Sequence, residues 1–334
     1  MPNALSSTPR RAHVLGGAGL PIEPQAVDQL ERVAARPDCL CAVGQPDLHA
    51  GPGLPIGAAF AMSKVHPALV GGDAGCGVTM FVVARPKRAG DRLLRRLDQN
   101  FDEPEHYDEE VARAAWFGGV SALAELTSLP PKLRALAAEV APEDTLPPSA
   151  DPPCELVSAG LASIGGGNHF AEIARRHEVA DRSATKALGC DERARVILVH
   201  SGSRRVGKAL AERHADDPRG YLEGLAGAVR FAQANRFLLA YRCLDALGGR
   251  VRMHLDRTHN TVEPSRFGED ACFLHRKGCA PAVRDMLTVV LGSRGTPSWL
   301  LRGLGNDALL SSVAQGAGRR MNRNDARARF REHG

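Results

Sequence analysis

Aromatic residues are scarce in this sequence and make up only 4% of its 334 residues. We therefore expect smaller side chains, mainly Ala, Val and Leu, to fill the core. Long apolar runs are missing as well, and none approaches the roughly 20 residues of a membrane-spanning helix. Glycines interrupt the stretch after Arg10-Arg11, where a twin-arginine export signal would need an apolar segment. The sequence thus predicts a cytoplasmic protein that does not enter a membrane.

Lysine is also rare, with six among the 43 basic residues, so arginine carries most of the positive charge. Arginine recognises phosphate in a bidentate manner, although a coding bias would produce the same composition. The net charge of +5 is compatible with nucleic-acid binding without requiring it. Hydrophobic residues at 43% and charged residues at 24% are typical of a globular protein and exclude a disordered or collagen-like chain.

Disulfide bonds are not expected, even though the eight cysteines form an even number. Disulfide frameworks are typical of small secreted chains, whereas a chain of this length can bury a large core without them. We expect most of these cysteines to be buried thiols. Cys76 is the exception, because it lies in a glycine-rich loop beside other polar residues.

Apolar runs, glycine-rich loops and helical patterns alternate along the chain. Pro24 followed by apolar residues at helical spacing predicts a helix, and an apolar stripe predicts a long helix over 221–247. Expected strands cover 39–43, 78–84, 196–199, 251–258 and 287–291. Residues 91–140 are expected to form helices with a break at Pro130-Pro131, and glycine-rich loops to cover 45–53 and 71–77. Alternation places His254 on the polar face of its strand, without a role. This order predicts an α/β fold whose chemistry gathers in loops at strand ends.

Five side chains that can bind metal ions lie in or beside such loops: Asp73, Cys76, His169, His200 and His259. Glycines around Asp73 and Cys76 permit a sharp turn that points both side chains at one place. A carboxylate, a thiolate and three imidazoles suit Mn, Fe, Co or Zn, and a bridging thiolate could hold two metals, a common device in phosphoryl chemistry. A closed structural zinc site fits less well, because such sites are rich in cysteine. The alternative is that these five residues are unrelated.

Glycine runs form a second pattern. Gly165–Asn168 and Gly316–Gly318 could present backbone N–H groups to a phosphate. Short glycine runs are more often simple turns, so this pattern alone indicates little.

Eight short motifs together resemble the RtcB family of RNA ligases. In chain order they are Pro46-Asp-Leu-His-Ala-Gly51, Gly72-Asp-Ala-Gly-Cys-Gly77, Gly165-Gly-Gly-Asn-His-Phe-Ala-Glu-Ile173, His200-Ser-Gly-Ser-Arg204, His259-Asn260, His275-Arg-Lys-Gly278, Gly292-Ser-Arg-Gly-Thr296 and Gly316-Ala-Gly-Arg319. Each motif is a weak match, but eight in the family's order over residues 46–319 are highly specific. The compact length and the His-Arg-Lys-Gly-Cys-Ala-Pro stretch look more like the release-factor-H-associated branch.

The resemblance implies a fold and an activity. The fold would have central β-sheets flanked by helices, with one catalytic domain over 13–334, a flexible segment 1–12, a proline-rich loop at 141–153 and a short C-terminal end. The activity would be ligation of RNA 3′-phosphate or 2′,3′-cyclic phosphate ends to 5′-hydroxyl ends, in RNA repair or tRNA splicing, with GTP and two Mn²⁺ ions. A family histidine takes up GMP and passes it to the RNA. A release-factor-like or activating protein is an expected partner.

The resemblance also implies roles for individual residues. Asp73, Cys76 and His169 would hold one Mn²⁺, and Cys76, His200 and His259 the other. The guanylate site would be lined by Asn168, His169, Phe170, Ala171, Glu172, His259, Asn260, Leu291, Gly292, Ser293, Arg294, Ser298, Gly316, Ala317 and Gly318. Arg204 and Lys277 would contact RNA phosphate, and Asp47 would act through its neighbours.

Two features depart from the family pattern. Gln315 stands where the family has its nucleophilic histidine, and an amide is a hydrogen-bonding group without useful nucleophilicity. The guanine-binding lysine near the family's C-terminus has no counterpart, and arginines from Arg319 onward occupy this stretch instead. The alternative function is therefore a guanylation-deficient relative that binds RNA ends or only opens cyclic phosphates.

Overall fold

The computed structural model describes residues 12–16, 22–101, 106–141, 146–147, 149–176, 178–293 and 295–318. The expectations for residues 1–11, for 142–145 and 148 of the proline-rich loop, for Arg294 and for the arginines from Arg319 onward lie outside these residues. The chain divides into two compact units, one made of Met1–Leu69 and Val262–Gly334 and the other of Val70–Thr261. The expectation of one catalytic domain over 13–334 stays a prediction.

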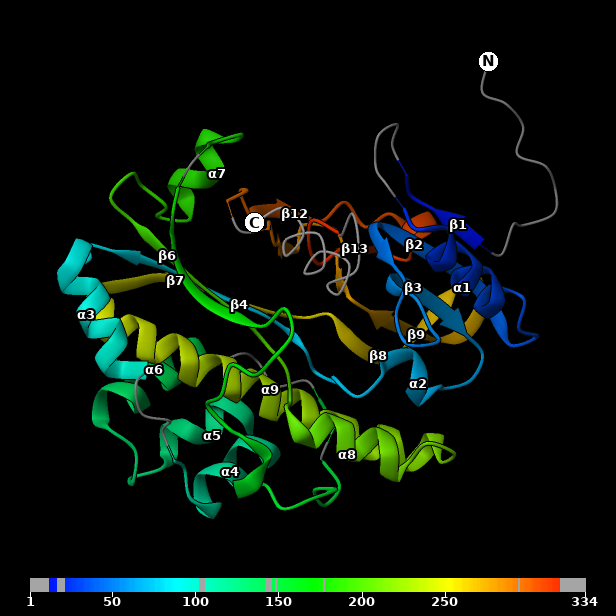
Figure 1. The fold of residues 1–334 in the computed structure, drawn as a ribbon, viewed down its shortest axis with the longest axis horizontal. Helices are drawn as coiled ribbons and strands as arrows, with labels where there is room; N and C mark the ends of the chain where they lie inside the picture. The colour runs from blue at the N-terminus through cyan, green and yellow to red at the C-terminus, as the bar shows by residue number, and fades with distance from the viewer. Residues whose placement is uncertain are drawn as a thin grey trace, which may run out of the picture. The chain divides into compact units, whose positions relative to one another are not determined.

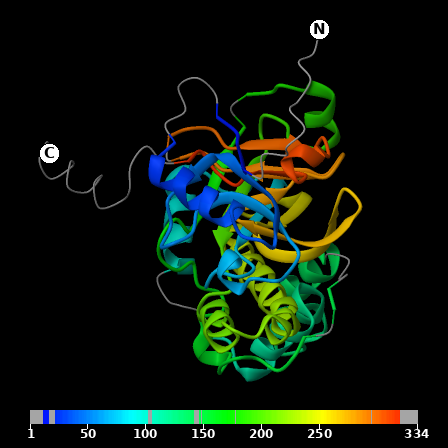
Figure 2. The ribbon, with the colours of Figure 1, turned by 90° about the vertical axis from the view of Figure 1, so that its right-hand side faces the viewer.

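The first unit contains a five-stranded sheet with the strand order β1-β2-β3-β9-β8. Its strands are β1 (Ala12–Val14), β2 (Cys39–His49), β3 (Ile56–Met62), β8 (Asn260–Phe267) and β9 (Asp270–Lys277). Helix α1 (Pro24–Ala34) begins with the expected proline and lies against this sheet (Figure 2). Its Leu30 and Val33 belong to the buried cluster between helix and sheet. The unit also contains α2 (Pro67–Val70), η2 (Asp307–Leu309), a ladder of β10 (Cys279–Pro281) with β13 (Ser312–Ala314), and a ladder of β11 (Leu287–Val290) with β12 (Trp299–Arg302).

Strand β2 is longer than the sequence predicts. It continues to His49, through residues expected to form a loop, and the expectation of a strand ending at 43 is wrong. Its pairing with β3 is irregular between Gly44 and His49. A local irregularity of this kind lets a strand accommodate Pro46, which cannot donate to a ladder. Asp47 is therefore fixed in a buried strand rather than on an open loop.

The second unit contains a four-stranded antiparallel sheet with the order β5-β6-β4-β7. Its strands are β4 (Gly77–Ala84), β5 (Phe170–Arg175), β6 (Arg195–Ser201) and β7 (Arg250–Thr258). Its helices are α3 (Gly90–Phe101), α4 (Glu109–Phe117), α5 (Gly119–Glu125), α6 (Pro131–Val140), α7 (Arg182–Ala187), α8 (Arg205–Arg213) and α9 (Pro218–Leu247), with the 3-10 turn η1 (Val157–Ala159). Residues 91–140 are helical as expected, but Gly118 provides a further break, between α4 and α5.

The long helix predicted over 221–247 is confirmed as α9. Asp217 caps its N-terminus by accepting a hydrogen bond from the Gly220 N–H at 3.0 Å, and proline occupies its first turn. Figure 1 shows α9 lying between the sheet of this unit and the helices α3, α4 and α5, and contacts on both sides agree. A helix covered on both sides buries most of its surface, so its polar residues need partners inside the protein.

The interior is filled largely by Ala, Val and Leu, as the low aromatic content predicts. All eight cysteines are free, and six of them are buried, which confirms the expectation of buried thiols. His254 pairs with Phe81 across the sheet and is half-buried, with 4.6 Å between the two ring centroids, so the strand face expected to be polar is partly covered at this position. Among the described residues, no helix has both the length and the apolar character needed to cross a membrane.

Candidate metal centre

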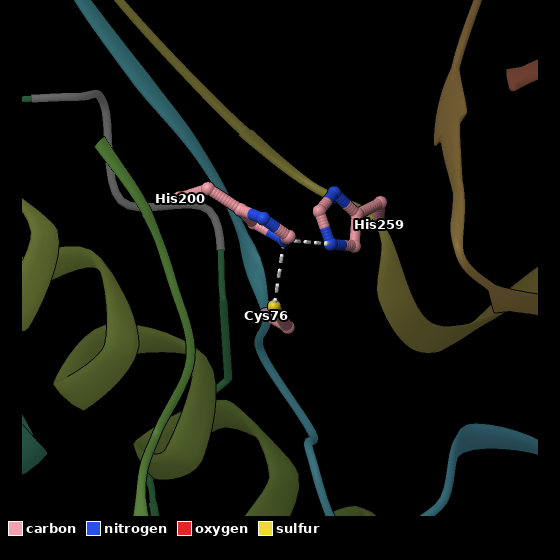
Figure 3. A group of neighbouring side chains, drawn as sticks. All are labelled: Cys76, His200 and His259. Carbon is pink, nitrogen blue, oxygen red and sulfur yellow. Dashed lines mark hydrogen bonds between the residues drawn. The ribbon is translucent and has the colours of Figure 1, made fainter. Parts of the chain in front are cut away.

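Three strands of the second unit bring Cys76, His200 and His259 together. Cys76 directly precedes β4, His200 lies near the end of β6, and His259 follows β7. Val78 pairs with His200 and Gly77 pairs with Thr258, so the start of β4 and the ends of β6 and β7 lie at the same end of the sheet. The Cys76 Sγ lies 3.4 Å from Nε2 of His200, and that nitrogen lies 3.2 Å from Nε2 of His259 (Figure 3). All three residues are buried.

A second triad shares the same sulfur. The Cys76 Sγ lies 3.3 Å from Nε2 of His169, and this nitrogen lies 3.2 Å from Oδ2 of Asp73. The Asp73 side chain is 41% exposed, whereas that of His169 is 7% exposed. The structure therefore brings all five expected metal-binding side chains together as two triads around Cys76, of which the Asp73 side chain is the most exposed.

Glycines make the approach of these loops possible. Gly75, next to Cys76, has φ +77°, and a Cβ there would lie 3.0 Å from the Cα of Val229 on α9. A Cβ on Gly202 would lie 2.1 Å from Oδ1 of Asp73. Larger residues at these two positions would push the loops apart.

Hydrogen bonds orient the histidine rings. Nδ1 of His200 donates to the carbonyl of Asn168 at 3.0 Å, which leaves the Nε2 lone pair facing the cluster. Arg204 donates instead to Nδ1 of His169 at 3.1 Å, so Nε2 of this ring is the donor in its hydrogen bond to Oδ2 of Asp73. Ligation through His169 Nε2 requires that this proton leaves and that the guanidinium of Arg204 moves from Nδ1.

Burial determines the protonation states of the cluster. It lowers the pKa of His200 to about 4 and that of His259 well below its usual value, so both rings are neutral at pH 7. Burial also raises the pKa of the Cys76 thiol. For Asp73, burial acts to raise the pKa, but hydrogen bonding and attraction by His169 outweigh it and lower the pKa. Neutral imidazoles and an ionised carboxylate are the forms that bind metals, and the thiol loses its proton on binding.

The donor set fits a pair of divalent cations. Each triad offers its atoms within 4.8 Å of one another, and one thiol sulfur belongs to both. Imidazole, carboxylate and thiolate together suit the borderline metals from Mn to Zn. The residues present therefore fit the metals that the sequence resemblance implies.

The expected guanylate residues fall into two groups, one in each unit. In the second unit, Asn168 and His169 lead into β5, which begins with Phe170, Ala171 and Glu172. Burial raises the pKa of the Glu172 carboxyl. Asn260 donates from Nδ2 to the carbonyl of Asp73 at 3.1 Å, so it contributes to holding the metal-binding loop.

In the first unit, Leu291 and Gly316 form a parallel bridge, and the Leu291 N–H donates to the Gln315 carbonyl at 2.9 Å. Ser298 accepts from the N–H of Gly292 at 3.0 Å, which closes the loop that also holds Ser293. Ala317 and Gly318 follow directly, and a Cβ on Gly318 would lie 3.1 Å from the Cα of Asp47. Lys277 is the last residue of β9.

Asp47 is hydrogen-bonded to the loop that contains Gln315. Its Oδ2 accepts from the Gly316 N–H at 3.3 Å, and burial raises the pKa of this carboxyl to about 7. Within the described part of the chain, Asp47 Oδ1 and Gln315 Oε1 are buried without hydrogen-bond partners. The structure therefore brings Asp47 next to position 315, where the sequence resemblance places the family's nucleophile.

Sequence reasoning missed three residues close to the cluster: the buried Asn235 and Arg236, and Asp256, whose side chain is 7% exposed. The available signal was the pair Asn235-Arg236 inside a long apolar helix pattern. Both side chains are fully buried, and their hydrogen bonds are to the loops that carry the metal-binding residues.

Comparisons with known proteins agree with the motifs. The family model described as tRNA-splicing ligase RtcB matches residues 29–220 and 215–334. An Escherichia coli protein named RNA-splicing ligase RtcB2 is 33% identical over 326 residues, covering 92% of this chain and 76% of that protein. RNA-splicing ligase RtcB of Mycobacterium tuberculosis is 27% identical over 370 residues, covering 89% of this chain and 84% of the relative. RNA-splicing ligase RtcB of Escherichia coli K12 is 27% identical over 362 residues, covering 93% of this chain and 82% of that relative. The family model matches most of the chain, and each of these relatives aligns with about nine-tenths of it. The chain therefore belongs to the RtcB family of RNA-splicing ligases.

Proposed function

We propose that this chain is an RNA ligase that joins 3′-phosphate or 2′,3′-cyclic phosphate ends to 5′-hydroxyl ends, with GTP and two Mn²⁺ ions. The observation that supports it best is the pair of triads that share the Cys76 sulfur. Cations held there would neutralise phosphate charge during transfer. The names of the relatives point to the same substrate class, RNA.

The residues around the cluster have definable roles in this proposal. The guanidinium of Arg204 lies beside His169 and can bind two oxygens of an RNA phosphate. Glu172 offers an acceptor to the nucleotide base, and Asn168 and Asn260 hold the loops that frame it. Asp47 accepts the Gly316 N–H and so keeps the glycine loop at 316–318 in place for phosphate. Lys277 would add a second phosphate contact.

Gln315 limits how far this chain can perform the reaction by itself. A carboxamide cannot accept GMP as an imidazole does. We therefore keep a second candidate function, binding of RNA ends or opening of cyclic phosphates without guanylation, because Gln315 specifically favours it. The RNA-end chemistry is shared by both candidates.

A single assay separates these candidates. RNA strands carrying a 2′,3′-cyclic phosphate and a 5′-hydroxyl are incubated with the protein, Mn²⁺ and GTP, with Cys76→Ala as the control. Joined product that depends on Cys76 supports ligation. Opening of the cyclic phosphate without joining supports the second candidate. The absence of both reactions contradicts ligation and cyclic-phosphate opening and leaves only binding of RNA ends. We also propose that the protein is cytoplasmic and binds a release-factor-like protein, and co-purification of the two from cytoplasmic extract tests this.

A further inference from the structure

Two consecutive polar residues lie fully buried in the middle of α9. Asn235 and Arg236 both have an exposed fraction of 0%. Burying a guanidinium costs several kcal/mol unless every donor finds a partner. Replacing such a buried charge by an apolar side chain is often neutral for stability. The contacts of these two side chains therefore point to a role in geometry rather than in stability.

Arg236 connects two of the ligand-bearing segments. Its Nη1 donates to the carbonyl of Gly75 at 2.7 Å and to the carbonyl of Ser201 at 2.9 Å. Gly75 immediately precedes Cys76, and Ser201 immediately follows His200. One guanidinium nitrogen thus joins the backbones that carry a sulfur and an imidazole 124 positions apart in the sequence.

The other edge of the same guanidinium is fixed by Asp256. Nε donates to Oδ2 at 2.8 Å and Nη2 donates to Oδ1 at 2.7 Å, a bidentate pair, and the Thr79 hydroxyl also donates to this carboxylate. Asp256 lies on β7, three residues before His259. A bidentate pair fixes both the position and the plane of the guanidinium, so the backbone near His259 is tied to the same group.

Asn235 holds a third segment. Its Nδ2 donates to the Ser201 hydroxyl at 3.0 Å, the Ser163 carbonyl at 3.1 Å and the Gly202 carbonyl at 3.2 Å. Its Oδ1 accepts from the Ser163 N–H at 3.0 Å. Ser163 directly precedes the segment of Ile164 and three glycines that leads to Asn168 and His169. The amide therefore links the His169 segment to the His200 segment.

We propose that Asn235 and Arg236 are positioning residues that fix the spacing of Cys76, His169, His200 and His259 before any metal binds. This inference rests on the proposed metal-binding function. A planar guanidinium can serve two carbonyls and one carboxylate at once, which a lysine ammonium cannot do in the same geometry. Groups that orient metal ligands from behind typically change metal affinity by 10- to 100-fold when altered.

The test compares Arg236→Lys with Arg242→Lys. Arg242 is a matched control, because it is also buried on α9 and also donates to a carbonyl, that of Asn100 at 2.9 Å from Nε, away from the cluster. The first readout is amide hydrogen exchange of metal-free protein in peptides covering 72–77 and 199–204. The second is Co²⁺ titration followed by the visible absorption of the bound ion, which reports ligand geometry.

We expect Arg236→Lys to accelerate exchange in both peptides, to change the Co²⁺ spectrum and to weaken Co²⁺ binding by roughly tenfold or more. Arg242→Lys should leave all three unchanged, even where both variants lower the melting temperature equally. Loop exchange in Arg236→Lys that matches the control, with an unchanged Co²⁺ spectrum, overturns the proposal.

Two further measurements distinguish a failure of the positioning role from a failure of the proposed metal-binding function. Asp256→Asn keeps the side-chain volume and should shift both readouts in the same direction by less, so it replaces Arg236→Lys if that variant does not fold. An unaltered Asp256→Asn protein would then overturn the proposal. Failure of the wild-type chain to bind Co²⁺ counts against the metal-binding function, while accelerated exchange in the variant would still support the positioning role.

Discussion

The sulfur of Cys76 lies 3.4 Å from Nε2 of His200, although 124 positions separate the two residues in the sequence. The antiparallel pairing of β4 with β6 produces this contact, because Val78 pairs with His200. The same sulfur lies 3.3 Å from His169, and both triads depend on it. The placement of the candidate metal-binding side chains therefore depends on the pairing of the strand ends that carry them.

The loop before β4 should be sensitive to any added side chain. Gly75→Ala places a Cβ about 3 Å from backbone atoms of Val229 and Ala228 on α9 and also imposes a left-handed conformation on alanine, at φ +77°. We expect a loss of roughly 2–4 kcal/mol in unfolding free energy, from about 1–2 for the backbone conformation and about 1–3 for overpacking. Chemical denaturation measures it.

Gly53→Ala is the control for this prediction, because Gly53 has φ +79° and open space where a Cβ would lie. It should lose only the conformational part, roughly 1–2 kcal/mol. Equal losses in the two variants would contradict the close packing of Gly75 on α9.

Asp47 should make the stability of the protein fall as the pH rises. Burial raises its pKa from 3.8 to about 7, so the folded state binds a proton more tightly than the unfolded state does. Stability from this group is fully present below pH 3.8 and is lost progressively as the pH rises towards 7. Every tenfold difference in proton affinity between the folded and unfolded states corresponds to about 1.4 kcal/mol of unfolding free energy.

Asp47→Asn removes this titration while its side-chain oxygen can still accept the Gly316 N–H. The difference in unfolding free energy between wild type and variant should therefore change across pH 4–7. As the pH rises, the wild type should lose stability relative to the variant. Denaturant titrations at several pH values check this, and a difference that stays constant over that range would contradict the buried state of the carboxyl.

Position 315 should decide whether the chain accepts GMP. Gln315→His supplies an imidazole beside Asp47 and the glycine loop at 316–318, so we expect a covalent GMP adduct in the variant after incubation with Mn²⁺ and GTP. If the second candidate function is right, the wild-type chain, with its amide, shows none; an adduct on the wild-type chain would require a nucleophile at another position and would favour ligation. Intact-mass spectrometry measures both, and Gln315→Asn serves as a control of similar polarity without an imidazole. A variant without adduct would contradict the role of position 315 in guanylate transfer.

Local sequence patterns predict most of the elements but not their ends. The proline start of α1, the alternation in β7 and the long apolar stripe of α9 are local signals, and the structure confirms each element. The extension of β2 to His49 could not be predicted, because Pro46 and Asp47 look like loop residues until pairing with β3 is known. Strand ends depend on the partner strand, which the local sequence does not contain.

The candidate metal-binding residues could be predicted by type, but their convergence could not. Cys76, His200 and His259 are polar residues at strand ends, which the sequence shows. Their meeting depends on the strand order β5-β6-β4-β7, a long-range property. The pair Asn235-Arg236 inside an apolar helix pattern shows that two polar residues need buried partners, but it does not show which partners. Half of their hydrogen bonds are to backbone carbonyls, which leave no trace in residue identity.

The most direct test of this account is the number of metal ions that each chain binds. Purified protein is stripped with a chelator, loaded with Mn²⁺ or Co²⁺, dialysed and analysed for metal content. Cys76→Ala is measured beside it, with Cys243→Ala as the control, because Cys243 is a buried thiol of α9 outside the triads. We predict two ions per chain in the wild type and in the Cys243 variant and loss of both ions in the Cys76 variant, because the two triads share one sulfur. Two ions retained by Cys76→Ala, or none bound by the wild type, would contradict the account.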